Sequence, residues 1–163
     1  MSIYSFFRIS KPSAEQVAPE KVDSTYKSIR NKTFWGVTVA YSLYYVCRMS
    51  LSVVKQPLID EGVLSAGELG VIGSALLFVY AVGKFMNGFI ADYCNIKRFM
   101  ATGLFISALI NLLLGVLGVF NDFVPLSTAV IFFSFAILWG LNGWMQSMGS
   151  PPGVICLSRW FPK

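Results

Sequence analysis

Four long apolar stretches divide this sequence and limit the folds that it can adopt. They cover residues 33–57, 64–91, 99–120 and 126–158. Each reaches about 20 residues or more, and a helix of that length, rising ~1.5 Å per residue, crosses a hydrocarbon core about 30 Å thick. We therefore expect an all-α membrane protein with four transmembrane helices.

The overall composition points the same way and argues against several classes of function. Hydrophobic residues make up 55 % of the chain and charged residues only 13 %, whereas about a quarter of a soluble domain is charged. There is no histidine, and the three cysteines (Cys47, Cys94 and Cys156) are far apart in sequence. A zinc site, a Cys/His pair or a disulfide framework lacks the necessary residues. No pair of carboxylates suited to acid–base catalysis is apparent either, so we expect neither an enzyme nor a bound metal or cofactor.

The basic residues mark one side of the membrane. They gather in three places: the N-terminal segment 1–32, the connector 92–98 with Lys97 and Arg98, and the C-terminal segment 159–163. Basic flanks usually stay in the cytoplasm, so we expect both ends of the chain to be cytoplasmic. A basic tail can also bind nucleic acid, but no aromatic or glycine pattern interleaves these charges, and we expect no nucleic-acid partner.

The beginning of the chain allows two interpretations. Residues 1–9 read MSIYSFFRI, and the apolar Ile3, Phe6 and Phe7 precede Arg8. Such a segment can lie on a membrane surface or form a flexible tail. The sequence does not separate the two.

Two cations interrupt the apolar stretches. Arg48 lies ~21 Å from the expected cytoplasmic edge of the first span, and Lys84 lies ~10 Å from the same edge in the second. A charge at the centre of a span costs roughly 2.5 to 3.5 kcal/mol, and no acidic residue lies deep in any of the four spans. Either another segment or an anionic ligand must therefore supply the countercharge. For Lys84, extension of the side chain to the interface is an alternative.

Polar residues recur at helical spacing around these cations. Residues at i, i+3, i+4 and i+7 share one helix face, and three such stripes are present: Tyr41, Tyr44, Tyr45 and Arg48; Tyr80, Lys84 and Asn87; Asn142, Gln146 and Gly149. The stripes suggest a water-filled cavity between helices. An arginine fork binds a tetrahedral oxyanion bidentately, a lysine acts as a point charge, and phenol hydroxyls donate to phosphate oxygens.

At the level of motifs, the chain resembles the organophosphate:phosphate antiporters of the major facilitator superfamily. The resemblance rests on YSLYYVCRMSL, GELGVIGSALLFVYAVGKFMNGFIAD, NIKRF and GWMQSMGSPPG, which occur in that family's order and spacing, and it runs from about Tyr26 to the end of the chain. It implies a phosphate-binding role for Arg48. By the same resemblance, the other substrate-binding residues are Lys84, Tyr41, Tyr45, Tyr80 and Gln146.

The resemblance also assigns a gating loop between the second and third helices. That loop covers Gly88 to Arg98, and Gly88, Asp92, Lys97 and Arg98 are its expected functional residues. Asp92 resembles the acid that contacts neighbouring helix ends and arginines. Two positions depart from the family pattern: Met49 replaces a lysine, which puts affinity and substrate choice in question, and Tyr93 replaces an arginine, which weakens the gate network.

The family fold has two six-helix halves with the substrate site between them. We therefore expect this chain to be the N-terminal part of a longer transporter, interrupted in a cytoplasmic loop. The resemblance implies exchange of inorganic phosphate for glycerol phosphate or a hexose phosphate by a monomer in the bacterial inner membrane. The alternatives are a sugar-phosphate sensor of the same family, which transports little, and a four-helix membrane protein that acts as an oligomer.

Overall fold

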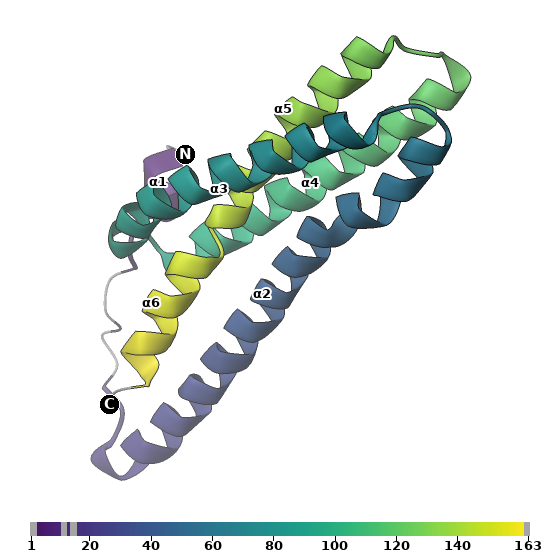
Figure 1. The fold of residues 1–163 in the computed structure, drawn as a ribbon. Coiled ribbons are helices and arrows are strands. Elements are labelled where there is room, and N and C mark those ends of the chain that lie inside the picture. The colour runs from purple at the N-terminus through teal and green to yellow at the C-terminus, as the bar shows by residue number, and fades with distance from the viewer. Residues whose placement is uncertain (1–2, 11–12, 14–15, 162–163) are drawn as a thin grey trace.

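The computed structural model describes residues 3–10, 13 and 16–161. It is a bundle of long helices, with no strand among the described residues (Figure 1). In chain order, the elements are α1 (Ile3–Phe7), the 3₁₀ turn η1 (Pro19–Lys21), α2 (Val22–Asp60), α3 (Ala66–Tyr93), α4 (Ile96–Phe123), α5 (Thr128–Ser147) and α6 (Ser150–Trp160).

Four helical segments are long and apolar enough to cross a membrane. They are Pro19–Asp60, Ala66–Tyr93, Ile96–Phe123 and Thr128–Trp160, and they confirm the expected all-α membrane fold with four transmembrane helices. The 39 residues of α2 make a helix about 58 Å long, which exceeds a hydrocarbon core of about 30 Å. Residues 22–32, expected to precede the first span, are thus helical and extend it.

Local signals in the sequence explain where the helices begin. Ser65 and Glu68 form a capping box at the start of α3, in which each side chain bonds to the other residue's backbone N–H. The Asn95 side chain accepts from Arg98 N–H to cap α4. Before α3, the chain turns at Gly62 with a φ of 68°, a left-handed conformation that glycine adopts without steric cost.

The fourth span is divided into two helices. α5 ends at Ser147 and α6 begins at Ser150. The break follows from Pro151 and Pro152: neither has a backbone N–H, so the carbonyls of Ser147 and Met148 lose the donors that a continuous helix would supply. A single helix over 126–158 was expected, and the two prolines are the physical reason for the difference.

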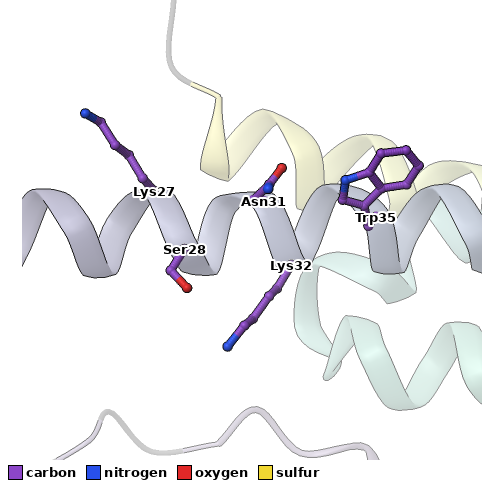
Figure 2. A pocket seen from close by; sticks show the side chains of 5 residues that line it. All are labelled: Lys27, Ser28, Asn31, Lys32 and Trp35. Atoms are coloured by element: carbon purple, nitrogen blue, oxygen red, sulfur yellow. The ribbon is translucent and has the colours of Figure 1, made fainter.

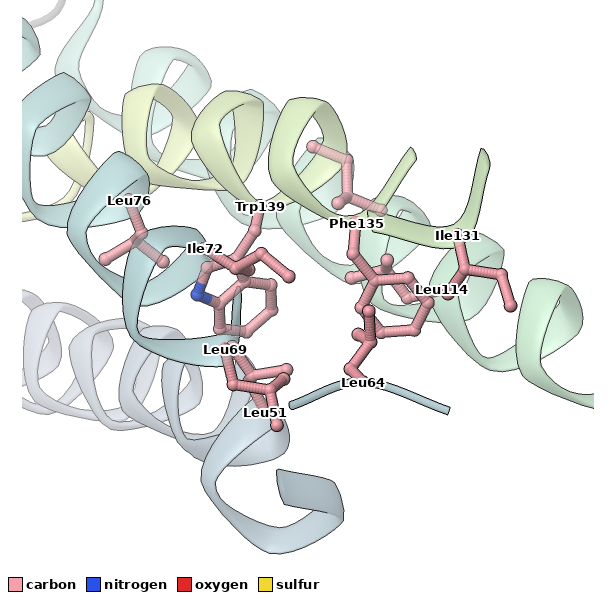
Figure 3. Packing of buried hydrophobic residues seen from close by; sticks show 10 residues of the cluster. Leu51, Leu64, Leu69, Ile72, Leu76, Leu114, Ile131, Phe135 and Trp139 are labelled. Atoms are coloured by element: carbon pink, nitrogen blue, oxygen red, sulfur yellow. The ribbon is translucent and has the colours of Figure 1, made fainter. Parts of the chain in front are cut away.

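The core forms where α3 crosses α5 and where α2 and α4 pack beside them. Gly143 of α5 lies so close to the Leu76 carbonyl of α3 that a side chain at this position would clash with backbone. Figure 3 shows the apolar side chains that fill the space around this crossing, which come from all four spans. The buried members are Leu51, Leu64, Leu69, Ile72, Leu76, Ile110, Leu114, Ile131, Phe135 and Trp139.

Candidate functional site

Arg48 and Lys84 meet at one aromatic ring. The guanidinium carbon of Arg48, on α2, lies 4.4 Å from the centroid of the Tyr80 ring on α3. The Lys84 ammonium, one helical turn further along α3, lies 5.7 Å from the same centroid. The two cations, which are 36 positions apart in the sequence, therefore lie near the same aromatic ring, between α2 and α3.

Two further tyrosines, both on α2, lie beside this pair of cations. Arg48 lies 5.3 Å from the centroid of the Tyr45 ring. The Tyr45 ring in turn packs edge-on against Tyr41, with centroids 5.3 Å apart. The structure thus brings together five of the six residues expected to bind substrate. We call Tyr41, Tyr45, Arg48, Tyr80 and Lys84 the cationic face.

The cationic face has no countercharge of its own. Within residues 3–10, 13 and 16–161, no carboxylate forms an ion pair with Arg48 or Lys84. The Arg48 Nε–H is also buried without a hydrogen-bond partner. Contact with an aromatic face stabilises a cation by about 0.5 to 2 kcal/mol. This is less than the free energy of roughly 2.5 to 3.5 kcal/mol that a charge costs at the centre of a span. An anion would supply the opposite charge that this arrangement lacks.

Tyr44 does not belong to this face, although its spacing predicted that it would. Its ring is 2 % exposed, and its hydroxyl donates to the Met100 carbonyl of α4 at 2.8 Å. A side chain on Gly103 would overlap the Tyr44 hydroxyl, and one on Gly149 would overlap the Tyr44 ring. The interpretation of Tyr44 as part of a cavity-lining stripe is therefore wrong: it joins α2 to α4 and to the α5–α6 break.

Gln146, the sixth expected binding residue, lies apart from the others in a buried network. It is 1 % exposed, and its Nε2 donates to Ser107 Oγ of α4 at 2.8 Å. Ser107 Oγ donates to Asn142 Oδ1 at 2.5 Å. Gln146 Oε1 and Asn142 Nδ2 are left without a hydrogen bond. A binding role for Gln146 remains a prediction.

The same network continues from α4 to α2. Asn111 Nδ2 donates to the Ser107 carbonyl at 2.8 Å, and the Ser50 hydroxyl donates to Asn111 Oδ1. We call Ser50, Ser107, Asn111, Asn142 and Gln146 the buried polar network. Sequence reasoning missed Ser50, Ser107 and Asn111. The signal that points to them is the presence of polar residues on two helices, α2 and α4, within stretches where apolar residues dominate.

A second buried pair joins α3 to α5. Asn87 is 2 % exposed, and its Nδ2 donates to Ser147 Oγ at 2.6 Å. The Ser147 hydroxyl donates to the Trp144 carbonyl at 2.6 Å. Asn87 thus faces α5 rather than the cationic face, although the spacing placed it with Tyr80 and Lys84. Part of each expected polar stripe serves contact between helices.

The segment expected to be a gating loop lies at one end of the bundle, but only Cys94 and Asn95 of it lie outside helices, because α3 continues to Tyr93 and α4 begins at Ile96. Asp92 pairs with Arg159 of α6 at 3.9 Å, and both side chains are more than half exposed. Gly88 faces Pro151 at the first turn of α6. Lys97 is exposed, and Arg98 donates to the Phe6 carbonyl at 2.7 Å. A gating role for these residues remains a prediction.

Two hollows in the described part of the chain have linings that include no residue of the cationic face. Figure 2 shows an open hollow of about 640 Å³ on the first turns of α2, lined by Lys27, Ser28, Asn31, Lys32 and Trp35. A hollow of about 270 Å³ lies between α2, α4 and α5, beside Ser50 and Asn111. Its remaining lining is apolar or glycine. Among the described residues, no group of three His, Cys, Asp or Glu side chains could hold a metal ion.

Fold and site together define a multi-pass membrane protein with unpaired cations between its first two spans. A protein-family model described as Major Facilitator Superfamily matches residues 37–163, which is well over half of the chain. The chain belongs to the Major Facilitator Superfamily.

Several curated proteins of this kind are similar over most of the chain. A probable hexose phosphate transport protein of Chlamydia pneumoniae is 35 % identical over 97 % of this chain and 32 % of its own length. A glycerol-3-phosphate transporter of Haemophilus influenzae is 36 % identical over 93 % of the chain and 30 % of its own length. The membrane sensor protein UhpC of Escherichia coli is 29 % identical over 88 % of the chain and 30 % of its own length. The chain thus spans about a third of the length of these relatives.

Proposed function

We propose that this chain forms part of a secondary transporter that exchanges an organic phosphate for inorganic phosphate. The observation that carries the proposal is the cationic face, where Arg48 and Lys84 share the Tyr80 ring with no ion-pair partner among the described residues. The names of two of the relatives, a hexose phosphate transport protein and a glycerol-3-phosphate transporter, support this class of substrate.

In this proposal the substrate's phosphoryl group is the missing countercharge. The Arg48 fork binds two phosphoryl oxygens, since a planar guanidinium matches that geometry. Lys84, which lies 5.7 Å from the centroid of the same Tyr80 ring, adds positive potential. The hydroxyls of Tyr41, Tyr45 and Tyr80 donate to the anion or shape its site, and Gln146 contributes once it is released from Ser107.

Transport then follows from alternating access. In transporters of this fold, substrate binds near the bilayer midplane, and the two halves rock about that site. Exchange, rather than one-way transport, requires that the carrier without substrate changes poorly between its two orientations. The two uncompensated cations explain this, because closure of the site without an anion would bury both charges. We also propose a bacterial inner membrane as the location and a cytoplasmic N-terminus. The clustering of basic residues supports this orientation.

The test is exchange in proteoliposomes that contain the complete protein and are loaded with inorganic phosphate. External labelled glycerol phosphate or hexose phosphate should enter in exchange for internal phosphate. Arg48→Lys keeps the charge but loses the bidentate geometry, so exchange should be nearly abolished. If Arg48→Lys exchanges as fast as the wild type, the role assigned to Arg48 is wrong.

A second candidate function is that of a membrane sensor for organic phosphates. The similarity to UhpC and the presence of Met49 where the transporter pattern has a lysine favour it. A sensor would bind the same anion at Arg48 but exchange little. Binding of labelled organic phosphate without uptake into the same proteoliposomes would identify the sensor and exclude the transporter.

A further inference from the structure

The N-terminal segment of the chain lies against the α3–α4 connector (Figure 1). A helix leaves its last four carbonyls without intrahelical partners, and α1 has only five residues. Two of these carbonyls accept bonds from the connector. Asn95 N–H donates to the Phe7 carbonyl at 2.8 Å, and Arg98 Nη1 donates to the Phe6 carbonyl at 2.7 Å. The connector therefore caps α1.

Side chains add to these backbone contacts. The Phe7 ring packs edge-on against Phe99, with centroids 6.2 Å apart, and it lies on a small buried cluster of Ala91, Phe99 and Met148. The Arg98 guanidinium lies 5.1 Å from the centroid of the Phe6 ring. Phe7 thus packs on apolar side chains at this end of the bundle, and Phe6 contacts the Arg98 cation.

This contact accounts for the structure of α1. An isolated helix shorter than about 12 residues is marginal in water, so a helix of five residues forms because its surroundings stabilise it. Neither sequence interpretation of residues 1–9 included such a contact. Residues 1–2 lie outside the described residues, but Phe6 and Phe7 contact the protein itself rather than extending as a tail.

We propose that the connector end of α3 and α4 is a docking site for an aromatic peptide segment, and that its occupant is this chain's own residues 3–10. The docked segment is a removable strap across the α3–α4 connector, and the helix ends that flank this connector carry Asp92, Lys97 and Arg98. While the strap is docked, Arg98 Nη1 bonds the Phe6 carbonyl and the guanidinium lies over the Phe6 ring, and undocking frees both contacts. The docking stands independently of transport; the control of a gate by the strap rests on the proposed function.

The native Cys94 provides a direct test. It directly precedes Asn95 in the sequence, and its side chain packs on the same buried cluster as Phe7. In the complete protein with Cys47→Ser and Cys156→Ser, and with any further cysteine replaced, the labelling of Cys94 by a maleimide reports opening of the strap. Phe7→Ala should speed this labelling about tenfold, since reagent access follows the population of the open state. Ile9→Ala is the matched control, because Ile9 is 55 % exposed, and it should leave the rate unchanged.

Hydrogen exchange of the Asn95 amide gives a second readout that does not depend on thiol chemistry. Deletion of residues 1–10 removes the carbonyl that this amide bonds and should speed its exchange, while the Leu69 amide at the far end of α3 should not change. Unaltered Cys94 labelling in Phe7→Ala, together with unaltered Asn95 exchange in the deletion variant, would overturn the docking. No substrate enters either experiment, so the result is separate from the success or failure of phosphate exchange.

Discussion

The cationic face lies on α2 and α3, and the buried polar network lies on α2, α4 and α5; the two regions differ in how far their polar side chains are bonded within the protein. In the network, Ser107 bonds Asn142 and Gln146 at once. On the cationic face, Arg48 and Lys84 have aromatic contacts but no ion-pair partner in the described part of the chain. Each side chain of the network has at least one hydrogen bond within the protein, although Asn142 Nδ2 and Gln146 Oε1 have none, whereas the two cations lack an opposite charge among the described residues and can bind one from a ligand.

Two adjacent tyrosines illustrate the difference between a side chain that joins helices and one on the cationic face. Tyr44 is 2 % exposed and bonded to Met100, while Tyr45 is 43 % exposed and lies beside Arg48. One step along a helix turns a side chain by about 100°, which is enough to move it from the core to the open face. The following predictions test whether the two regions really have separate roles.

The largest expected effect is on phosphate binding by Arg48→Lys. Loss of a bidentate, largely desolvated charge contact should cost about 3 kcal/mol, or roughly a hundredfold in affinity. Arg30→Lys is a matched control, because Arg30 also lies over two rings, 5.5 Å from Tyr26 and 5.3 Å from Phe161, outside the cationic face. Equilibrium dialysis of labelled phosphate with the complete protein measures both. Equal losses in the two variants would mean that the cationic face has no special role.

Ser107→Ala should have the next largest effect, and on stability. It removes the acceptor of Gln146 Nε2 and the donor to Asn142 Oδ1. Hydrogen bonds between membrane helices average ~0.6 kcal/mol, so loss of two should cost about 1 to 2 kcal/mol. Ser74→Ala is the control, since the exposed Ser74 bonds only the Gly70 carbonyl of its own helix. Thermal unfolding in detergent compares them, and identical melting temperatures would refute a stabilising role for the network.

The adjacent tyrosines should give opposite results when each loses its hydroxyl. Tyr44→Phe leaves the Met100 carbonyl without this donor and should destabilise the protein by about 1 kcal/mol, with phosphate affinity unchanged. Tyr45→Phe should keep stability and weaken phosphate binding about fivefold, the equivalent of one neutral hydrogen bond. Melting curves and dialysis on both variants provide the comparison. A loss of affinity in Tyr44→Phe alone would reverse the assignment of the two side chains.

The smallest effect belongs to Asp92→Asn. The Asp92–Arg159 pair is 3.9 Å long, with side chains 57 % and 55 % exposed, and such a pair contributes at most about 0.5 kcal/mol to stability. The difference from wild type should also shrink as salt is added, because exposed charges are screened. A melting-temperature series in sodium chloride tests this. A larger, salt-independent loss would show that the pair is part of the packed structure.

The sequence was sufficient for the fold because length and apolarity alone determine whether a helix can cross a membrane. It was also sufficient to place Arg48 and Lys84 on either side of the midplane, at expected depths of ~21 Å and ~10 Å, where their long side chains can approach each other. It was not sufficient for Tyr44, Asn87 and Ser107. Helical spacing places residues on a face but does not say which neighbouring helix covers that face, and that depends on packing distant in sequence. The same limit applies to Phe7 and its contact with Phe99.

The account rests on the claim that an oxyanion completes the cationic face. The most direct measurement is the melting temperature of the complete protein as inorganic phosphate replaces chloride at constant ionic strength. A ligand that binds only the folded state adds about 2.7 kcal/mol at a concentration 100 times its dissociation constant. We predict that phosphate raises the melting temperature of the wild type by several degrees and does not raise that of Arg48→Lys. Asn87→Ala is the control: it should melt at a lower temperature than the wild type without phosphate, and phosphate should raise its melting temperature by the same amount. No rise in the wild type, or an equal rise in Arg48→Lys, would contradict the account.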